Sequence, residues 1–207
     1  MAKESNKDKS PKSKLRRELI LDAAYDVMVD EGYSAVTITK VAKRAGISPS
    51  HLQYYFRNAE EMIIAIHEQV LFNWESMIDQ AAFQYLGKEP PEKVLDRLIK
   101  KQIQLIKQPR NDIMIWETHA WAARNPVVKR SHEDWVDWYT DHLAGLIRDI
   151  NPKISSSRSF RVAAIISTLL DNIQRFLGES KPKPARFRGL EKELRHVIVG
   201  MIEQEEA

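Results

Sequence analysis

The segment "GISPSHLQYYF", Gly46–Phe56, combines polar and aromatic residues in an unusual way for a helix. Two tyrosines and a phenylalanine follow closely on two serines, a histidine and a glutamine. A buried helix excludes most of these polar side chains, whereas a solvated helix rarely carries so much aromatic area. The segment is therefore expected to contact a binding partner through its polar side chains.

Capping residues around this segment predict two short helices. Ser48 is a suitable N-cap, and Pro49 then takes the first helical position, where its missing N–H is not needed. This predicts a helix over 49–55. Thr37 is an N-cap of the same kind for a helix over 38–45, which a glycine ends. Two short helices joined by a turn that contains glycine form a helix-turn-helix.

Composition limits the classes of protein to consider. The chain has 207 residues, of which 43% are hydrophobic, and no cysteine. A disulfide framework and a thiolate metal site are therefore excluded. The lysine-rich start lacks the apolar core of a secretory signal, and no apolar run is long enough to span a membrane. A cytoplasmic protein is expected.

The net charge of +3 is confined to the first 60 residues, which hold 11 Lys or Arg and 8 Asp or Glu. Within them, the stretch 32–59 contains four basic residues and no acidic one. Residues 1–13 are lysine-rich and polar, and are expected to form a disordered basic arm. A basic arm beside an acid-free segment favours a polyanionic partner, although solvated charges can also cluster by chance.

The rest of the chain predicts helices and no strands. Apolar residues recur every three to four positions, and Gly, Pro, Asn and Ser separate the periodic segments. The expected helices cover 14–30, 58–85, 91–107, 111–124, 127–150, 155–178 and 187–204. With the two short helices, this gives an all-α chain of nine helices. The expected domains are a basic arm (1–13), a domain that carries the helix-turn-helix (14–60) and a larger helical domain (61–207).

The second helix of a helix-turn-helix enters the major groove of DNA, and its exposed side chains contact base edges. Leu52 and Phe56, four residues apart, are expected to face the core. Gln53 can form two hydrogen bonds with adenine, whereas tyrosine hydroxyls more often bind phosphate. The alternative is that Tyr54 and Tyr55 are core aromatics of a helical hairpin, which is possible for one of the two.

The stretch "TITKVAKRAGISPSHLQYYFRNAEEMIIAI" resembles the DNA-binding domain of the TetR family of transcriptional regulators over about residues 15–66. The residues that match the family pattern are Thr37, Val41, Ala42, Ala45, Gly46, Ile47, Ser48, Leu52, Tyr55 and Phe56. Gln53 stands where many members have Tyr, so base preference does not transfer. Ala59 stands where many have a phosphate-binding Lys, so that contact is expected either to be missing or to be supplied by Arg57.

From the helix-turn-helix and the resemblance together, we predict a set of DNA-contacting residues. They are Thr37, Thr39, Lys43, Ser48, Pro49, Ser50, His51, Gln53, Tyr54, Tyr55 and Arg57.

The resemblance also implies a small-molecule pocket in residues 61–207. Two expected helices, 111–124 and 127–150, each carry an aromatic face with a histidine, which suits a flat or cationic ligand such as a quaternary ammonium. The run "AWAARNP" loosely resembles choline-responsive members. The alternative is that these faces are plain core. The candidate pocket residues are Val70, Trp74, Met77, Trp116, His119, Trp138, Tyr139 and His142.

The resemblance implies, in addition, a homodimer formed by the last two helices. Each of them has a wide apolar face, and the alternative is burial of that face inside one chain. The candidate interface residues are Ile166, Leu170, Ile173, Leu177, Leu194 and Ile198.

We therefore expect a homodimeric transcriptional regulator, in which a small-molecule effector releases a repressor from a palindromic operator. The long helix at 58–85 is expected to transmit this signal, as the one connection between the two halves. An activator and an architectural DNA-binding protein are the alternatives within the same fold. An enzyme is not favoured, because the sequence shows no nucleophile motif, paired carboxylates or phosphate loop. No catalytic residue, metal ligand or cofactor is predicted.

Overall fold

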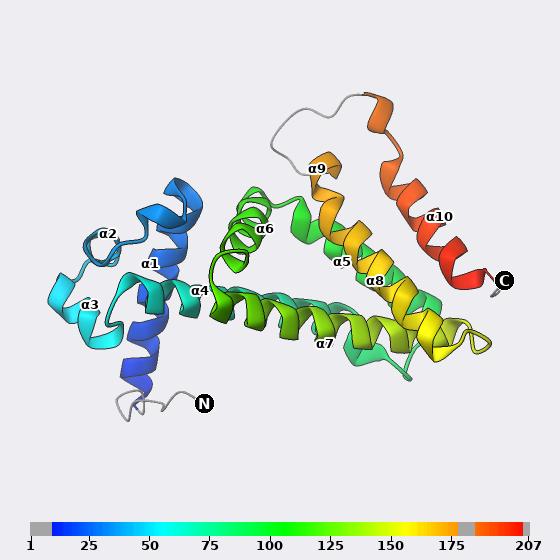
Figure 1. The fold of residues 1–207 in the computed structure, drawn as a ribbon, viewed down its shortest axis with the longest axis horizontal. Helices are drawn as coiled ribbons and strands as arrows, with labels where there is room; N and C mark the ends of the chain where they lie inside the picture. The colour runs from blue at the N-terminus through cyan, green and yellow to red at the C-terminus, as the bar shows by residue number, and fades with distance from the viewer. Residues whose placement is uncertain (1–9, 178–184, 205–207) are drawn as a thin grey trace. The chain divides into compact units, whose positions relative to one another are not determined.

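The computed structural model describes residues 10–177 and 185–204, which contain α-helices and short 3₁₀ turns but no β-strand. The elements, shown in Figure 1, are α1 (Pro11–Glu31), η1 (Tyr33–Ala35), α2 (Ile38–Arg44), α3 (Pro49–Tyr55), α4 (Ala59–Ala81), η2 (Phe83–Tyr85), α5 (Pro91–Ile106), α6 (Pro109–Ala122), α7 (Pro126–Ile150), α8 (Ser156–Asn172), α9 (Gln174–Leu177), η3 (Ala185–Phe187) and α10 (Leu190–Glu203).

These helices confirm the predicted all-α architecture. The four-residue α9 directly follows α8, and the two together correspond to the helix expected over 155–178. The long helix expected over 58–85 is divided into α4 and the 3₁₀ turn η2. Most of the expected basic arm, residues 1–9, lies outside the described residues. None of the described helices is long and apolar enough to cross a membrane.

The chain divides into two compact units. Unit 1 comprises Met1–Val70 and Glu117–Val128, and unit 2 comprises Leu71–Trp116 and Lys129–Ala207. The helices α4, α6 and α7 therefore each contribute residues to both units. This corrects the expectation that the long helix at 58–85 is the one connection between the two halves.

The core of unit 1 holds the helix-turn-helix together. Ile20 and Ala24 of α1 are fully buried, as are Val41 on α2 and the side chains of Leu52 and Phe56 at α3. Leu52 and Phe56 thus face the core, as their spacing predicted. The Arg17 guanidinium lies 4.9 Å from the centre of the Phe56 ring, which adds a cation–π contact from α1.

The end of α6 and the following turn complete unit 1. The Trp121 ring stacks on Tyr33 with 6.3 Å between ring centroids, and it meets the buried His67 edge-on at 6.4 Å. Asn125 accepts hydrogen bonds from the backbone N–H groups of Val127 and Val128, so it caps the start of α7. Its amide also donates to Glu60 Oε1 over 2.9 Å, which ties this turn to the beginning of α4.

Unit 2 is a helical bundle with a continuous apolar core. Buried residues of α5, α7, α8 and α10 meet there, and Figure 1 shows α10 beside α8. Two ion pairs, Lys107–Glu191 and Arg195–Asp96, join α10 to α5 and the residue that follows it. The Asn151 amide donates to the Ile202 carbonyl oxygen over 2.8 Å and fixes the other end of α10.

Candidate functional site

Two capped turns define the conformation of α2 and α3. Thr37 Oγ1 accepts from the Lys40 N–H at the start of α2, and Ser48 Oγ accepts from the His51 N–H at the start of α3, both over 3.2 Å. Gly46, in the turn between them, has a φ of 66°, a left-handed conformation that favours glycine. Both predicted N-caps are confirmed, and α3 has the predicted bounds, Pro49–Tyr55.

The face of α3 opposite its buried Leu52 is polar and solvent-exposed. Its exposed residues are Ser48, Pro49, Ser50, His51, Gln53 and Tyr54. Tyr54 is 51% exposed, whereas Tyr55 is half-buried and packs against the rings of Tyr54 and His51, at 5.2 and 5.7 Å between centroids. Of the two tyrosines, Tyr54 is therefore the more exposed to solvent.

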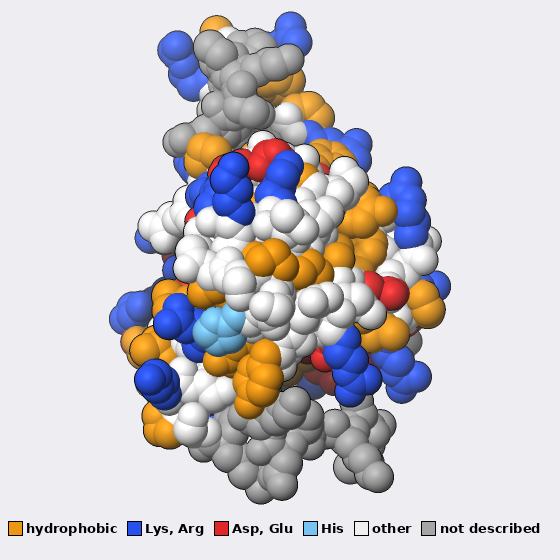
Figure 2. Space-filling view, turned by 90° about the vertical axis from the view of Figure 1, so that its left-hand side faces the viewer, with side chains coloured by type: hydrophobic (Ala, Val, Ile, Leu, Met, Phe, Trp, Pro, Cys, Tyr) orange, Lys and Arg blue, Asp and Glu red, His pale blue; other side chains and the backbone are white. Residues whose placement is uncertain are grey.

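Basic side chains surround this face, and ion pairs divide them into two groups. Lys40 and Arg44 of α2 are bound to Glu31 and Asp30 at the end of α1. Lys43 and Arg57 are exposed and form no ion pair within the described part of the chain. Figure 2, which looks at the side of unit 1 that carries α2 and α3, shows Lys and Arg side chains at the rim and few acidic ones. The other predicted contacts on α2, Thr37 and Thr39, are also exposed.

The turn before α4 supplies a further donor in place of the absent lysine at Ala59. Asn58 Oδ1 accepts from the Glu61 N–H over 2.8 Å, and the Glu61 carboxylate accepts from the Arg57 N–H over 2.8 Å. This reciprocal capping fixes the backbone on both sides of Ala59. It leaves the Arg57 guanidinium exposed at the end of α3, where a cation can contact phosphate.

The candidate pocket residues do not form one group. Val70 and His119 belong to unit 1, where Val70 is buried and His119 is exposed, and the other six belong to unit 2. Trp116 is 44% exposed, and the Arg175 guanidinium lies 4.9 Å above its ring. Trp116 is therefore a surface residue, and an arginine covers one face of its indole.

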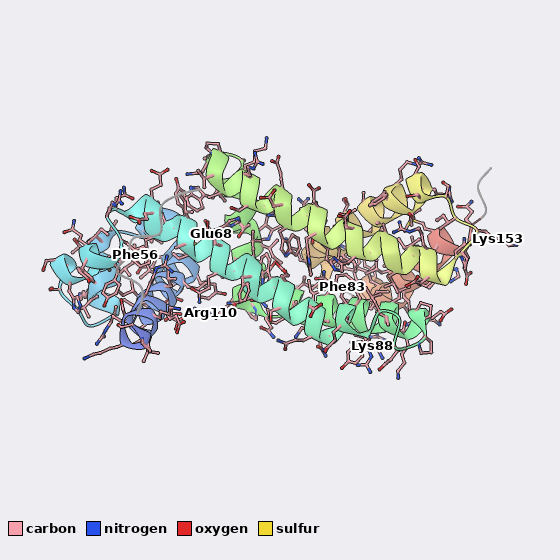
Figure 3. The ribbon with its side chains drawn as sticks, turned by 90° about the horizontal axis from the view of Figure 1, so that it is seen from below. Phe56, Glu68, Phe83, Lys88, Arg110 and Lys153 are labelled. Atoms are coloured by element: carbon pink, nitrogen blue, oxygen red, sulfur yellow. The ribbon has the colours of Figure 1, made fainter. Side chains whose placement is uncertain are left out.

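Four of the candidate residues lie in an aromatic cluster of unit 2, which we define as Trp74, Phe83, Trp135, Trp138, Tyr139 and His142. Trp135 packs between Trp74 and Tyr139, with centroid distances of 6.2 and 5.6 Å. Phe83, which Figure 3 shows beside α7, contacts Trp138, Tyr139 and His142. Met77 is half-buried against the same core.

His142 has the contacts of a packed core histidine. Its Nδ1 donates to the Trp138 carbonyl oxygen over 2.8 Å, and its ring stacks on Phe83 with 5.0 Å between centroids. These contacts match the alternative reading of this position as plain core.

Three polar residues of unit 2, two of which act on Tyr139 of the aromatic cluster, are absent from the sequence-based prediction. Gln102 and Gln174 are buried, and Asp171 on α8 is half-buried. Burial raises the pKa of the Tyr139 phenol and the Asp171 carboxylate raises it further, whereas the Gln102 amide has the opposite effect. Burial also raises the pKa of Asp171 to about 6. A signal was present in the sequence, since Gln102 interrupts the apolar series of Leu98 and Ile106 at intervals of four.

The structure corrects the predicted dimer-interface residues on the last two helices. Ile166, Leu170, Leu177, Leu194 and Ile198 are all at most 5% exposed in a single chain, and Ile173 is half-buried against the same core. These side chains pack between helices of one chain and have little surface left for a partner. The exposed apolar residues of these helices are instead Phe160, Ile165, Phe176 and Val197.

Comparisons with known proteins agree with this geometry. Residues 20–66 match the family model of bacterial regulatory proteins, tetR family. The HTH-type transcriptional regulator BetI of Rhizobium meliloti (strain 1021) is 31% identical over 120 residues, which cover 58% of this chain and 55% of that protein. The chain thus spans little more than half the length of that relative.

Solved structures show the same fold over nearly the whole chain. A transcriptional regulator of Pseudomonas aeruginosa PAO1 has a TM-score of 0.74 at 13% identity, covering 95% of this chain and 96% of its own. A regulator of Saccharomonospora viridis in complex with choline has a TM-score of 0.70 at 18% identity, covering 93% and 97%. The capped helix-turn-helix and the match over residues 20–66 thus show that this part of the chain resembles the tetR family of bacterial regulatory proteins, and the solved structures show that the fold is shared over nearly the whole chain.

Proposed function

We propose that this protein is a homodimeric transcriptional repressor that binds a palindromic operator through α3 and releases it when a small molecule binds unit 2. The main support for DNA binding is the exposed polar face of α3. The Ser48 cap fixes the start of this helix, and the surrounding segment contains no acidic residue. Short side chains at its start allow close approach to the groove, and Gln53 and Tyr54 follow one turn later.

Lys43 and Arg57 support contacts to the DNA backbone. Both are exposed, on either side of α3 in the sequence, and neither is neutralised by an acidic side chain of the described residues. Phosphate contacts of this kind fix the register of the recognition helix without reading sequence. Base reading is then assigned to the side chains of α3, with Gln53 as the principal contact.

Exposed apolar residues on α8 and α10 support the dimer. Ile165 and Val197 are 50% and 48% exposed, and the two helices pack against each other. Gly200 lies one turn after Val197, and space is open around it for a close approach of a second chain. A twofold arrangement of this pair would present two copies of α3, which a palindromic operator matches.

The likeness to a fold solved with choline supports an effector within unit 2, because it shows that this fold can hold a small molecule. The aromatic cluster supplies apolar contact area, and the adjoining polar side chains supply orientation.

Selection of binding sites from random duplex DNA by the purified protein tests the proposal. We expect a palindromic consensus, and a logarithmic plot of affinity against salt with a slope near −5 if a dimer neutralises roughly six phosphates. Lys43→Gln should reduce the magnitude of the slope by about one per protomer, whereas Lys100→Gln, an exposed lysine of unit 2, should leave it unchanged. If the selection recovers no consensus sequence but the salt slope is still near −5, architectural binding is favoured. A slope near zero would exclude the DNA interface.

A further inference from the structure

Four buried polar atoms of unit 2, two of them on rings of the aromatic cluster, have no hydrogen-bond partner in the described part of the chain. Tyr139 Oη, Trp135 Nε1, Gln102 Nε2 and Gln174 Oε1 are all buried and have no partner within hydrogen-bond distance among the described residues, although the Gln102 amide is close enough to the Tyr139 phenol to lower its pKa. Their side chains are between 1% and 8% exposed. The great majority of buried polar groups in proteins are paired, so four unpaired ones within unit 2 point to a place that can bind something polar.

Asp171 adds a negative charge to the same region. Its carboxylate acts electrostatically on the Tyr139 phenol, and it forms no ion pair or hydrogen bond within the described residues. Gln174 lies one helical turn further along, on α9. A carboxylate that is largely surrounded by protein and has no cation beside it is costly to keep ionised, and a positively charged ligand would remove that cost.

The neighbouring rings favour the same charge. Tyr139 stacks on Trp135 at an interplanar angle of 16°, and Trp74 meets Trp135 edge-on. Trp74 is only half-buried, so part of its indole remains accessible to solvent. The faces of such rings carry negative potential and attract ammonium groups, most strongly when these are desolvated. An anionic ligand would meet Asp171 and these rings with the same sign of charge.

We propose that the effector of this protein is an organic cation, an amine or quaternary ammonium compound. Asp171 is its counter-ion, Tyr139, Trp135 and Trp74 provide the aromatic contacts, and Gln102 and Gln174 bind its polar substituent. The proposal rests on the effector site of the proposed function and adds the chemical class of the ligand. All six side chains belong to unit 2.

Binding of matched ligands to the purified full-length chain tests the charge requirement. Choline and benzyltrimethylammonium are the cations, and 3,3-dimethylbutan-1-ol is the neutral carbon isostere of choline. Calorimetry and tryptophan fluorescence should show at least about tenfold tighter binding of a cation than of the isostere, because the carboxylate and the rings both act on charge. Equal affinities, or no binding of either cation at millimolar concentration, would overturn the proposal.

Two aspartate variants assign the charge to its residue. Asp171→Asn keeps the shape and removes the charge, and it should abolish the preference for the cation. Asp141→Asn, an exposed aspartate of α7, should retain it. Circular dichroism confirms that both variants are folded, and Tyr139→Phe provides a second variant that should weaken cation binding while keeping the ring. An unchanged preference in Asp171→Asn would contradict the assignment.

The operator assay is run separately, so that the two proposals can fail independently. Operator binding without binding of either cation would overturn the assignment of the ligand class and leave the DNA-binding regulator standing. Asp171-dependent cation binding by a protein that binds no operator would support the site and contradict the proposed function.

Discussion

Gln53 and Tyr54 are adjacent on α3 and both exposed, yet we expect them to act on DNA in different ways. Gln53→Ala should remove discrimination at one base pair of each half-site, at a cost of roughly 1–3 kcal/mol for the preferred sequence. Tyr54→Phe removes a hydroxyl assigned to phosphate, so it should weaken preferred and altered operators to a similar extent.

Competition binding with a set of single-base operator variants measures both effects. The diagnostic result is a flattened preference at one position for Gln53→Ala and an unflattened, uniformly weaker profile for Tyr54→Phe. If both variants lose affinity equally for every sequence, Gln53 is a backbone contact as well, and base reading belongs to another residue of α3.

Asp171 has a predicted effect on stability in the absence of ligand. Its pKa is raised from 3.8 to about 6 by burial, so the folded chain binds this proton more tightly than the unfolded chain. The free energy of unfolding therefore falls as pH rises between these values, and the loss persists at neutral pH. Asp171→Asn should be more stable than the parent by about 2–3 kcal/mol at pH 7, with the difference vanishing below about pH 4.

Urea unfolding at the two pH values measures this difference, with Asp141→Asn as the control that should match the parent at both. A variant less stable than the parent at pH 7 would mean that the carboxylate has a stabilising partner. Asp171 is thus expected to lower the free energy of unfolding and yet to be needed for ligand binding. Such a trade-off between stability and function is common at binding sites.

At the scale of elements, Asn125 joins two helices through one side chain. Its oxygen caps α7, and its amide donates to Glu60 at the start of α4. Asn125→Asp keeps the capping oxygen but replaces the donor with a carboxylate facing Glu60. We expect a loss of about 1–3 kcal/mol, because a buried acceptor then meets another acceptor.

Glu60→Gln in the same chain restores a donor opposite the new carboxylate, so the double variant should regain most of the stability. Thermal unfolding of the parent, both single variants and the double variant completes the cycle. Additive effects in that cycle would mean that the two side chains are not coupled.

The boundaries of the elements were predictable because local chemistry sets them. The caps Thr37 and Ser48 act within three residues of themselves, and sequence spacing alone identifies them. The assignment of Ile166 and Leu170 to a dimer interface was not reliable, since periodicity shows that a helix face is apolar but not which neighbour covers it. The grouping of Gln102 with Asp171 needed the structure, because three separate helices bring these side chains and Tyr139 together.

At the scale of the whole molecule, the proposed dimer predicts that exposed apolar residues of α8 and α10 become buried between two chains. Ile165 and Val197 are half exposed in one chain, so a charge at either position should leave the fold intact. Ile165→Asp combined with Val197→Asp should yield a folded monomer with much weaker operator affinity, because an interface core excludes unpaired charge. Sedimentation equilibrium and circular dichroism report assembly and folding separately.

Val127→Asp is the matched control, since Val127 is 51% exposed and lies in unit 1. It should remain as dimeric as the parent. Persistence of the dimer in the α8–α10 double variant would place the interface on another surface.

Effector and operator must also influence each other equally, if one protein binds both. A cation that lowers operator affinity about a hundredfold corresponds to a coupling free energy of about 2.7 kcal/mol, and the operator must then weaken the cation by the same factor. Trp74 and Trp135 lie in the aromatic cluster, so tryptophan fluorescence can follow the cation with and without operator. Because α4, α6 and α7 contribute to both units, substitutions in any of the three are expected to change this coupling. Identical cation affinities in the two titrations would show that the cation binds without acting as the inducer.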